Sequence, residues 1–106
     1  MANNMKKDFQ KVVKMFRESL PDYMGLCYNF ETHEWEKKPC RPEYPKAMMT
    51  EQQIRKGTAT INCGHEETAI GMMDYEPFKI WCESYGIKSV KHEMNSDKRY
   101  QVRVTF

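Results

Sequence analysis

The stretch INCGHEE, from Ile61 to Glu67, contains the side chains most suited to chemistry. A thiol, an imidazole and two carboxylates fall within five residues there. Cys63 with His65 resembles a nucleophile and its base, and His65 with the two glutamates resembles an acid/base cluster. Adjacent glutamates on a strand point to opposite faces, and the chain has no glycine-rich phosphate loop and no sign of an oxyanion hole. We therefore predict that the protein is not an enzyme.

A structural zinc site is the second chemistry that these residues suggest. Such a site needs four soft ligands in a tetrahedron, and short paired spacings hold two of them in place before folding. The chain offers one such pair, Cys63 and His65, and Cys27 and Cys40 would have to complete the set from distant positions. In the competing interpretation Cys27 and Cys63 lie on strands and His65 lies in a turn. We expect no cofactor, with zinc as the alternative.

A row of lysines on the first predicted helix is a candidate nucleic-acid site. Lys7, Lys11 and Lys14 lie opposite the apolar face of that helix and could follow a line of phosphates. The whole chain has 17 basic and 15 acidic residues, which is too balanced to indicate nucleic acid by itself. A charged outer face is also the ordinary surface of an amphipathic helix. Nucleic-acid binding is therefore the second function that we consider.

Aromatic and methionine residues in the connections indicate a protein partner. Tyr23, Trp35, Tyr44 and Met48 lie in or beside predicted connections, where the hydrophobic pattern does not bury them. Such side chains give large contact areas and adaptable packing. Prolines recur every third residue in PCRPEYP, which predicts an extended, polyproline-like connection over 39–49. Alternatively this connection folds back, and Tyr44 and Met48 cover the open end of the core.

The elements that carry these side chains follow from hydrophobic spacing. The first helix has its apolar residues on one face, ends before Pro21 and has Asn3 or Asn4 as its cap. Alternating apolar residues over 24–30 predict a half-buried strand, and the chain returns through Trp35 as a hairpin.

The second half of the chain begins with a short helix. Thr50 and Gln53 have the spacing of a capping box, and Gly57 supplies the left-handed stop. The segments 58–63 and 67–73 predict two more strands joined by a turn.

The last part of the chain predicts a helix and a hairpin. Asp74 caps the helix, which Gly86 ends, and the final hairpin turns at 95–97. Helix and hairpin thus alternate along the chain, which predicts one α+β domain spanning residues 1–106. We expect a mainly antiparallel sheet of hairpins, covered on one face by two longer helices and one short helix.

The ends and the composition of the chain bear on its location. No segment approaches the roughly 20 apolar residues of a membrane span, and no apolar stretch follows the first lysines as in a signal peptide. We therefore expect a cytoplasmic protein with reduced thiols and no membrane partner. A short chain without a catalytic constellation is typical of accessory, inhibitor or regulatory proteins, including those of phages and mobile elements. The predicted function is a small binding or regulatory protein, with another protein as partner ahead of nucleic acid.

Overall fold

The computed structural model describes residues 2–106, with side chains from Asn4 onward. Within this range the chain forms four helices and two antiparallel sheets, which confirms the α+β class. The elements in order are α1 Ala2–Ser19, β1 Tyr23–Asn29, β2 Glu34–Cys40, β3 Lys46–Met48, α2 Glu51–Lys56, β4 Thr58–Gly64, α3 Glu66–Asp74, α4 Glu76–Ser84, β5 Ser89–Met94 and β6 Tyr100–Thr105.

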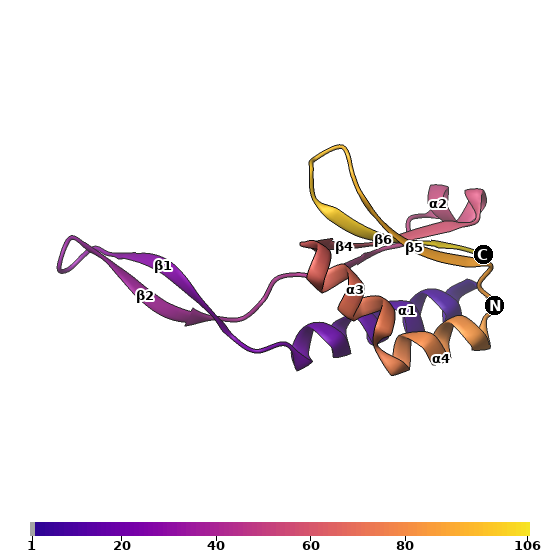
Figure 1. Cartoon of the computed structure of the whole chain (residues 1–106), viewed down its shortest axis with the longest axis horizontal. Helices are drawn as coiled ribbons and strands as arrows, with labels where there is room; N and C mark the ends of the chain where they lie inside the picture. Colours follow the sequence, from indigo (N-terminus) through magenta and orange to yellow (C-terminus); the bar gives the residue numbers. More distant parts are fainter. Residues whose placement is uncertain (1) are drawn as a thin grey trace.

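The body of the protein is a four-stranded sheet with helices on it. The strand order is β3-β4-β6-β5, and α1, α3 and α4 lie on one face while α2 lies on the other (Figure 1). Alternate residues of β4 and β6, such as Ile61 and Val102, are buried against the three helices, as the period of a strand requires. The largest fully buried side chains include Phe9 from α1 and Phe78 from α4. The core is therefore formed between one sheet face and three helices.

The first hairpin does not join this sheet. β1 and β2 pair only with each other and form a two-stranded arm that projects from the body (Figure 1). The molecule measures 54 × 27 × 24 Å and has a radius of gyration of 16.1 Å, whereas a compact chain of this length would have about 13 Å. The predicted strand over 24–30 is confirmed, but the prediction that it is half-buried is wrong.

The short second helix has the predicted caps. Thr50 Oγ1 accepts a hydrogen bond from Gln53 N at 3.2 Å, and Gln53 Oε1 accepts one from Thr50 N at 2.9 Å. Gly57 takes the left-handed conformation with φ 73° and donates its N–H to the last turn. A capping box and a left-handed glycine thus fix both ends of α2.

The segment predicted as a strand over 67–73 is the helix α3. Gly64, with φ 80°, and a register shift between β4 and β6 end the strand there, and His65 becomes the N-cap of the helix. Ala69 and Met72 are fully buried and lie three residues apart, which is the spacing of a helix face. Short apolar runs fit both periods, so the sequence alone could not separate them.

Smaller boundaries also differ from the predictions. Because α3 runs to Asp74, the N-cap of α4 is Tyr75 and not Asp74. The first helix begins at Ala2, before its predicted caps. The connection predicted over 39–49 is also shorter, since β2 extends to Cys40 and residues 46–48 form β3.

Candidate functional site

One face of the arm is almost entirely apolar. The strand register pairs Met24 with Pro39, Leu26 with Lys37 and Tyr28 with Trp35. Directly opposed residues in an antiparallel pair lie on the same face. We call these six residues the apolar face of the arm: Met24, Leu26, Tyr28, Trp35, Lys37 and Pro39.

The apolar face is open to solvent. The exposed fractions are 61% for Met24, 65% for Leu26 and 68% for Trp35, and Phe30 in the turn is 81% exposed. The Tyr28 ring makes edge contacts to Phe30 at 5.1 Å and to Trp35 at 5.4 Å between centroids. These side chains therefore support one another without being buried. Contiguous exposed apolar patches often mark interaction surfaces, which makes this face the candidate site.

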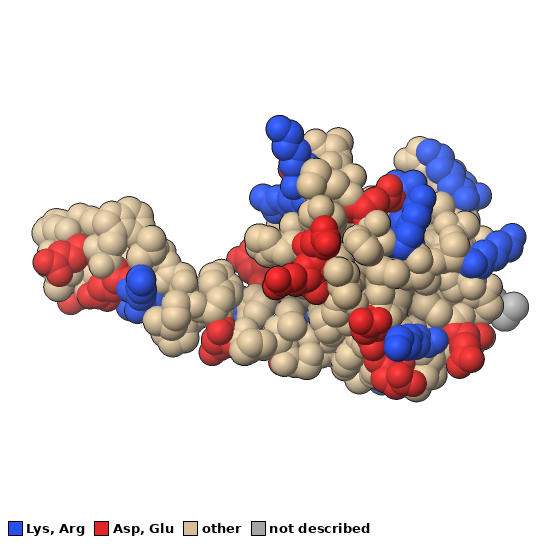
Figure 2. All heavy atoms as spheres, in the orientation of Figure 1, with Lys and Arg blue, Asp and Glu red and all other residues tan. Residues whose placement is uncertain are grey.

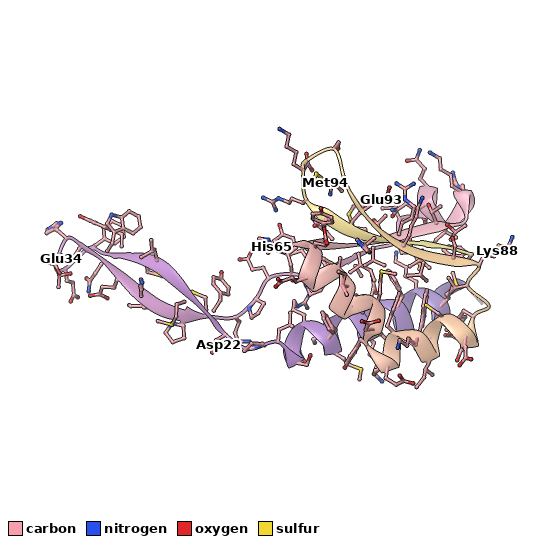
Figure 3. The ribbon with its side chains drawn as sticks, viewed as in Figure 1. Asp22, Glu34, His65, Lys88, Glu93 and Met94 are labelled. Carbon is pink, nitrogen blue, oxygen red and sulfur yellow. The ribbon has the colours of Figure 1, made fainter. Side chains whose placement is uncertain are left out.

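The opposite face of the arm is polar. Asn29 Nδ2 donates a hydrogen bond to Glu36 Oε1 at 2.9 Å, and Lys38 forms an ion pair with Glu36 at 3.8 Å. Asn29 Oδ1 also accepts from the backbone N–H of Glu31 at 2.9 Å, which orders the turn. Acidic side chains gather near the far end of the arm, where Figure 3 labels Glu34 and Figure 2 shows red spheres. The arm is thus an amphipathic ribbon, and all the charged residues of its strands except Lys37 lie on one side.

Arg41 fixes the root of the arm to the end of α1. Its Nη1 donates to Leu20 O at 2.9 Å and to Asp22 Oδ1 at 2.6 Å, and its Nη2 donates to Glu18 O at 3.1 Å. Carbonyls at a helix C-terminus lack partners within the helix, and a cation there also interacts favourably with the helix dipole. One side chain therefore satisfies the end of α1 and holds both strands of the root together.

Replacing Arg41 by alanine is expected to loosen the arm more than it destabilises the body. Because the guanidinium is half-exposed, we expect a loss of only about 0.5–1.5 kcal/mol in the free energy of unfolding. Small-angle X-ray scattering should show a broader distribution of arm orientations, while chemical denaturation measures the stability. The matched control is Arg55→Ala, since Arg55 is an exposed arginine on α2. An unchanged scattering profile for Arg41→Ala would show that Arg41 does not hold the arm in place.

The residues predicted for protein binding fall in two places. Trp35 and Tyr23 lie on the arm, with Trp35 on the apolar face and Tyr23 on the other. Tyr44 lies on the body, where its hydroxyl accepts a hydrogen bond from Arg99 Nη1 at 2.6 Å, and Met48 lies half-exposed on β3. The structure therefore does not gather the four residues into one surface.

Sequence reasoning missed most of the apolar face. Alternation over 24–30 predicts that Met24, Leu26 and Phe30 are half-buried, but the charged composition of the partner strand, EWEKKPC, indicates exposure. Apart from its terminal cysteine, that strand has only Trp35 and Pro39 as apolar residues, too few to help cover a core.

The proposed zinc ligands are not brought together. Cys27 lies on the exposed arm, Cys40 at its root and Cys63 in the core, while His65 is exposed at the start of α3. Among the described residues no group of three or more His, Cys, Asp or Glu side chains could hold a metal ion. Strand pairing separates these residues, because β1 and β2 pair with each other instead of with β4.

Burial makes Cys63 a poor nucleophile. Its side chain is 2% exposed, and burial raises the pKa of the thiol from 9.0 to about 12. The reactive form of cysteine is the thiolate, so Cys63 is protonated at neutral pH. Cys63 therefore lacks the thiolate form that a nucleophile paired with His65 would need.

Thiol labelling is expected to separate the cysteines sharply. At pH 8 a thiolate-selective reagent should label the exposed Cys27 in the folded protein and should label Cys63 only after unfolding. Since the folded pKa of Cys63 is raised, its burial stabilises the protein fully below pH 9, and this contribution is lost as the pH rises towards 12. Mass spectrometry of the labelled protein with and without urea measures the first effect. Rapid labelling of Cys63 in the folded state would contradict the assigned burial.

A hollow lies where the arm meets the body. Its volume is about 800 Å³, and its lining includes Tyr23, Tyr44, His65 and Arg99. Figure 3 shows His65 at the body end of this junction and Asp22 at the root of the arm. The Arg99 guanidinium is held by the Tyr44 hydroxyl. Cys63 and His65 of INCGHEE therefore border this hollow without forming a catalytic pair.

The lysines predicted for nucleic acid are exposed on α1. Lys7, Lys11 and Lys14 all face solvent, and Lys14 forms a long ion pair with Glu18 at 3.9 Å. An exposed pair of this kind contributes little energy. Nucleic-acid binding by this helix stays a prediction.

Comparison of the chain with protein families, with curated proteins and with solved structures finds no match. In the described part of the chain, no helix combines the length and the apolar composition that crossing a bilayer requires. The fold and the site define an α+β protein that carries a protruding amphipathic arm.

Proposed function

We propose that the protein acts by binding another protein through its β1–β2 arm. One observation supports this most strongly: a contiguous apolar face lies open on an element that contributes nothing to the core. The core and the partly buried residues packed on it include no residue of 23–40. The body thus has its own hydrophobic interior, and the apolar side chains of the arm have no structural task within the described residues.

The energetic argument supports the same proposal. Complete burial of a Leu, Met or Phe side chain stabilises by about 1.5–3 kcal/mol. A partner surface that buries Met24, Leu26 and Trp35 would therefore gain several kcal/mol of binding free energy. The loss of translational and rotational freedom on association costs a similar amount of free energy. Only a partner whose surface fits the arm closely gains net binding, which favours a specific partner over non-specific adhesion. Aromatic side chains at the centre of such a contact commonly dominate the binding energy.

The proposed role is that of a small regulator or inhibitor in the cytoplasm. An arm that reaches away from a compact body can enter a site on a partner without rearranging the body. All four cysteines are free, and Cys27 is exposed, which suits a reducing compartment. The proposal includes no catalysis and no cofactor.

Affinity capture from the host tests the proposal. The wild-type protein, the double variant Leu26→Ser/Trp35→Ser and the polar-face control Glu34→Ser serve as baits. We expect one partner to bind the wild type and the control and to be lost with the double variant. That partner, once purified, should bind the wild type saturably in a titration. If every captured protein binds all three baits equally, the arm is not the docking element.

The nucleic-acid alternative has its own test. A mobility-shift assay with mixed nucleic acids compares the wild type with the triple variant Lys7→Gln/Lys11→Gln/Lys14→Gln. Our proposal expects no complex even at low salt. A complex that weakens steeply with salt and is lost in the triple variant would favour the alternative, because phosphate contacts release counterions.

A further inference from the structure

Lys37 lies in the middle of the apolar face and is its only charged residue. Trp35 and Pro39 flank it on β2, and Leu26 lies directly opposite on β1. Lys37 forms no ion pair within the described residues, whereas its neighbour Lys38 pairs with Glu36 on the polar face. The acidic residues of β2, Glu34 and Glu36, alternate with Trp35 and therefore point away from Lys37.

We propose that the partner covers the arm with an apolar groove that carries a carboxylate facing Lys37. This inference rests on the proposed function and adds the chemistry of the partner. Any surface that covers Leu26 and Trp35 also removes water from the lysine between them. Burying an unpaired ammonium group is strongly unfavourable. A partner that supplies an aspartate or glutamate at this point avoids this cost, and this charge fixes the register of binding.

A second copy of the chain fits this face poorly. Two arms can pack face to face about a two-fold axis that crosses the ribbon at the level of Leu26 and Lys37. Lys37 would then face Lys37 of the second copy, and Leu26 would face Leu26 of the second copy. Two unpaired ammonium groups would then be buried together. Each arm has strands of seven residues, which gives a face of about 24 × 12 Å, or about 300 Å². Two such faces bury less than the roughly 1,000 Å² expected of a biological interface.

The small area of the apolar face favours a partner with a groove over a partner with a flat surface. A flat surface would cover only the apolar face, whereas a groove also contacts the strand edges and the protruding turn. The turn begins with Phe30, which is exposed and contacts Tyr28. A partner that encloses the tip therefore gains the area that a flat contact lacks.

A membrane surface also fits poorly. The apolar tip is surrounded by Glu31 and Glu34, and Figure 2 shows acidic residues near this end. Anionic lipid headgroups attract basic segments and repel carboxylates. The charges on the arm therefore favour a protein that supplies the negative charge itself.

The test replaces Lys37 by methionine and by glutamate and titrates each variant against the captured partner. Methionine keeps the apolar stem and removes only the charge. We expect Lys37→Met to weaken binding by about 30-fold and Lys37→Glu by more than about 100-fold. The matched control is Lys38→Met on the polar face, which should bind within about twofold of the wild type.

Three outcomes would overturn the inference. If Lys37→Met binds as well as or better than the wild type, the partner has no opposing carboxylate, although the proposed function stands. If sedimentation shows a dimer that Leu26→Ser/Trp35→Ser dissociates, a second copy occupies the face. If the protein binds vesicles of phosphatidylcholine and phosphatidylserine through Trp35, the surface is a lipid one. If the wild-type protein, with its arm intact, captures no partner, the proposed function itself is contradicted.

Discussion

Replacing Phe78 by alanine is expected to lower the free energy of unfolding by about 3–5 kcal/mol, which is the usual cost of truncating a buried phenylalanine. Phe78 is 1% exposed, and its ring stacks on Trp81 at 5.9 Å between centroids with an interplanar angle of 13°. The same truncation of Trp35 on the arm is expected to change stability by less than about 0.5 kcal/mol. Urea denaturation followed by circular dichroism measures both values.

The contrast between these two aromatic residues is the informative quantity. Domains of this size are stable by only about 5–15 kcal/mol, so Phe78→Ala can leave too little folded protein to measure. Phe78→Leu then serves in its place, with a smaller loss and no new polar group. A loss of several kcal/mol for Trp35→Ala would show that the arm packs on the body in solution.

Deleting the arm is expected to abolish partner binding and to leave the body folded. Residues 23–40 are replaced by Asn-Gly, which joins Asp22 to Arg41. The two ends are close, because Tyr23 pairs with Cys40 and Arg41 bonds to Asp22 at 2.6 Å. The shortened chain should keep a cooperative thermal transition, and its radius of gyration should fall from 16.1 Å to about 12 Å.

Two measurements check the deletion. Small-angle scattering with thermal melting reports on the body, and titration with the captured partner reports on binding. The full chain taken through the same purification is the control. A deleted chain that aggregates or melts without cooperativity would show that the arm belongs to the folding unit, and retained binding would place the docking surface on the body.

Several elements could be predicted from the sequence because their signals are local. The capping box at Thr50 and the stop at Gly57 each depend on residues within one or two turns. The final hairpin follows from alternation in two strands that border the turn after Met94. The helix at Glu66–Asp74 could not be identified, since its apolar run is short and fits both periods.

The candidate site was harder to predict because burial is not a local property. Alternation over 24–30 reports a strand, but it does not report whether another layer covers the strand. The hydrophobic pattern leaves Trp35 as an exposed aromatic residue, whereas it places Leu26 on the buried face of a half-buried strand. The charged composition of residues 34–38 is the usable signal, since a hairpin with one polar strand has too few apolar side chains to form part of a core. The hypotheses about Cys63 and His65 depended on long-range pairing that the sequence does not encode locally.

The exposure of Trp35 tests the central claim most directly. The chain has two tryptophans, and Trp81 is buried in the core, so the variant Trp81→Phe leaves Trp35 as the only indole. We expect its fluorescence to be that of a water-exposed indole, readily quenched by acrylamide at all protein concentrations, and to become protected when the partner is added. A protected indole in the isolated protein at high dilution would contradict the account, because the apolar face would then already be covered by the chain itself.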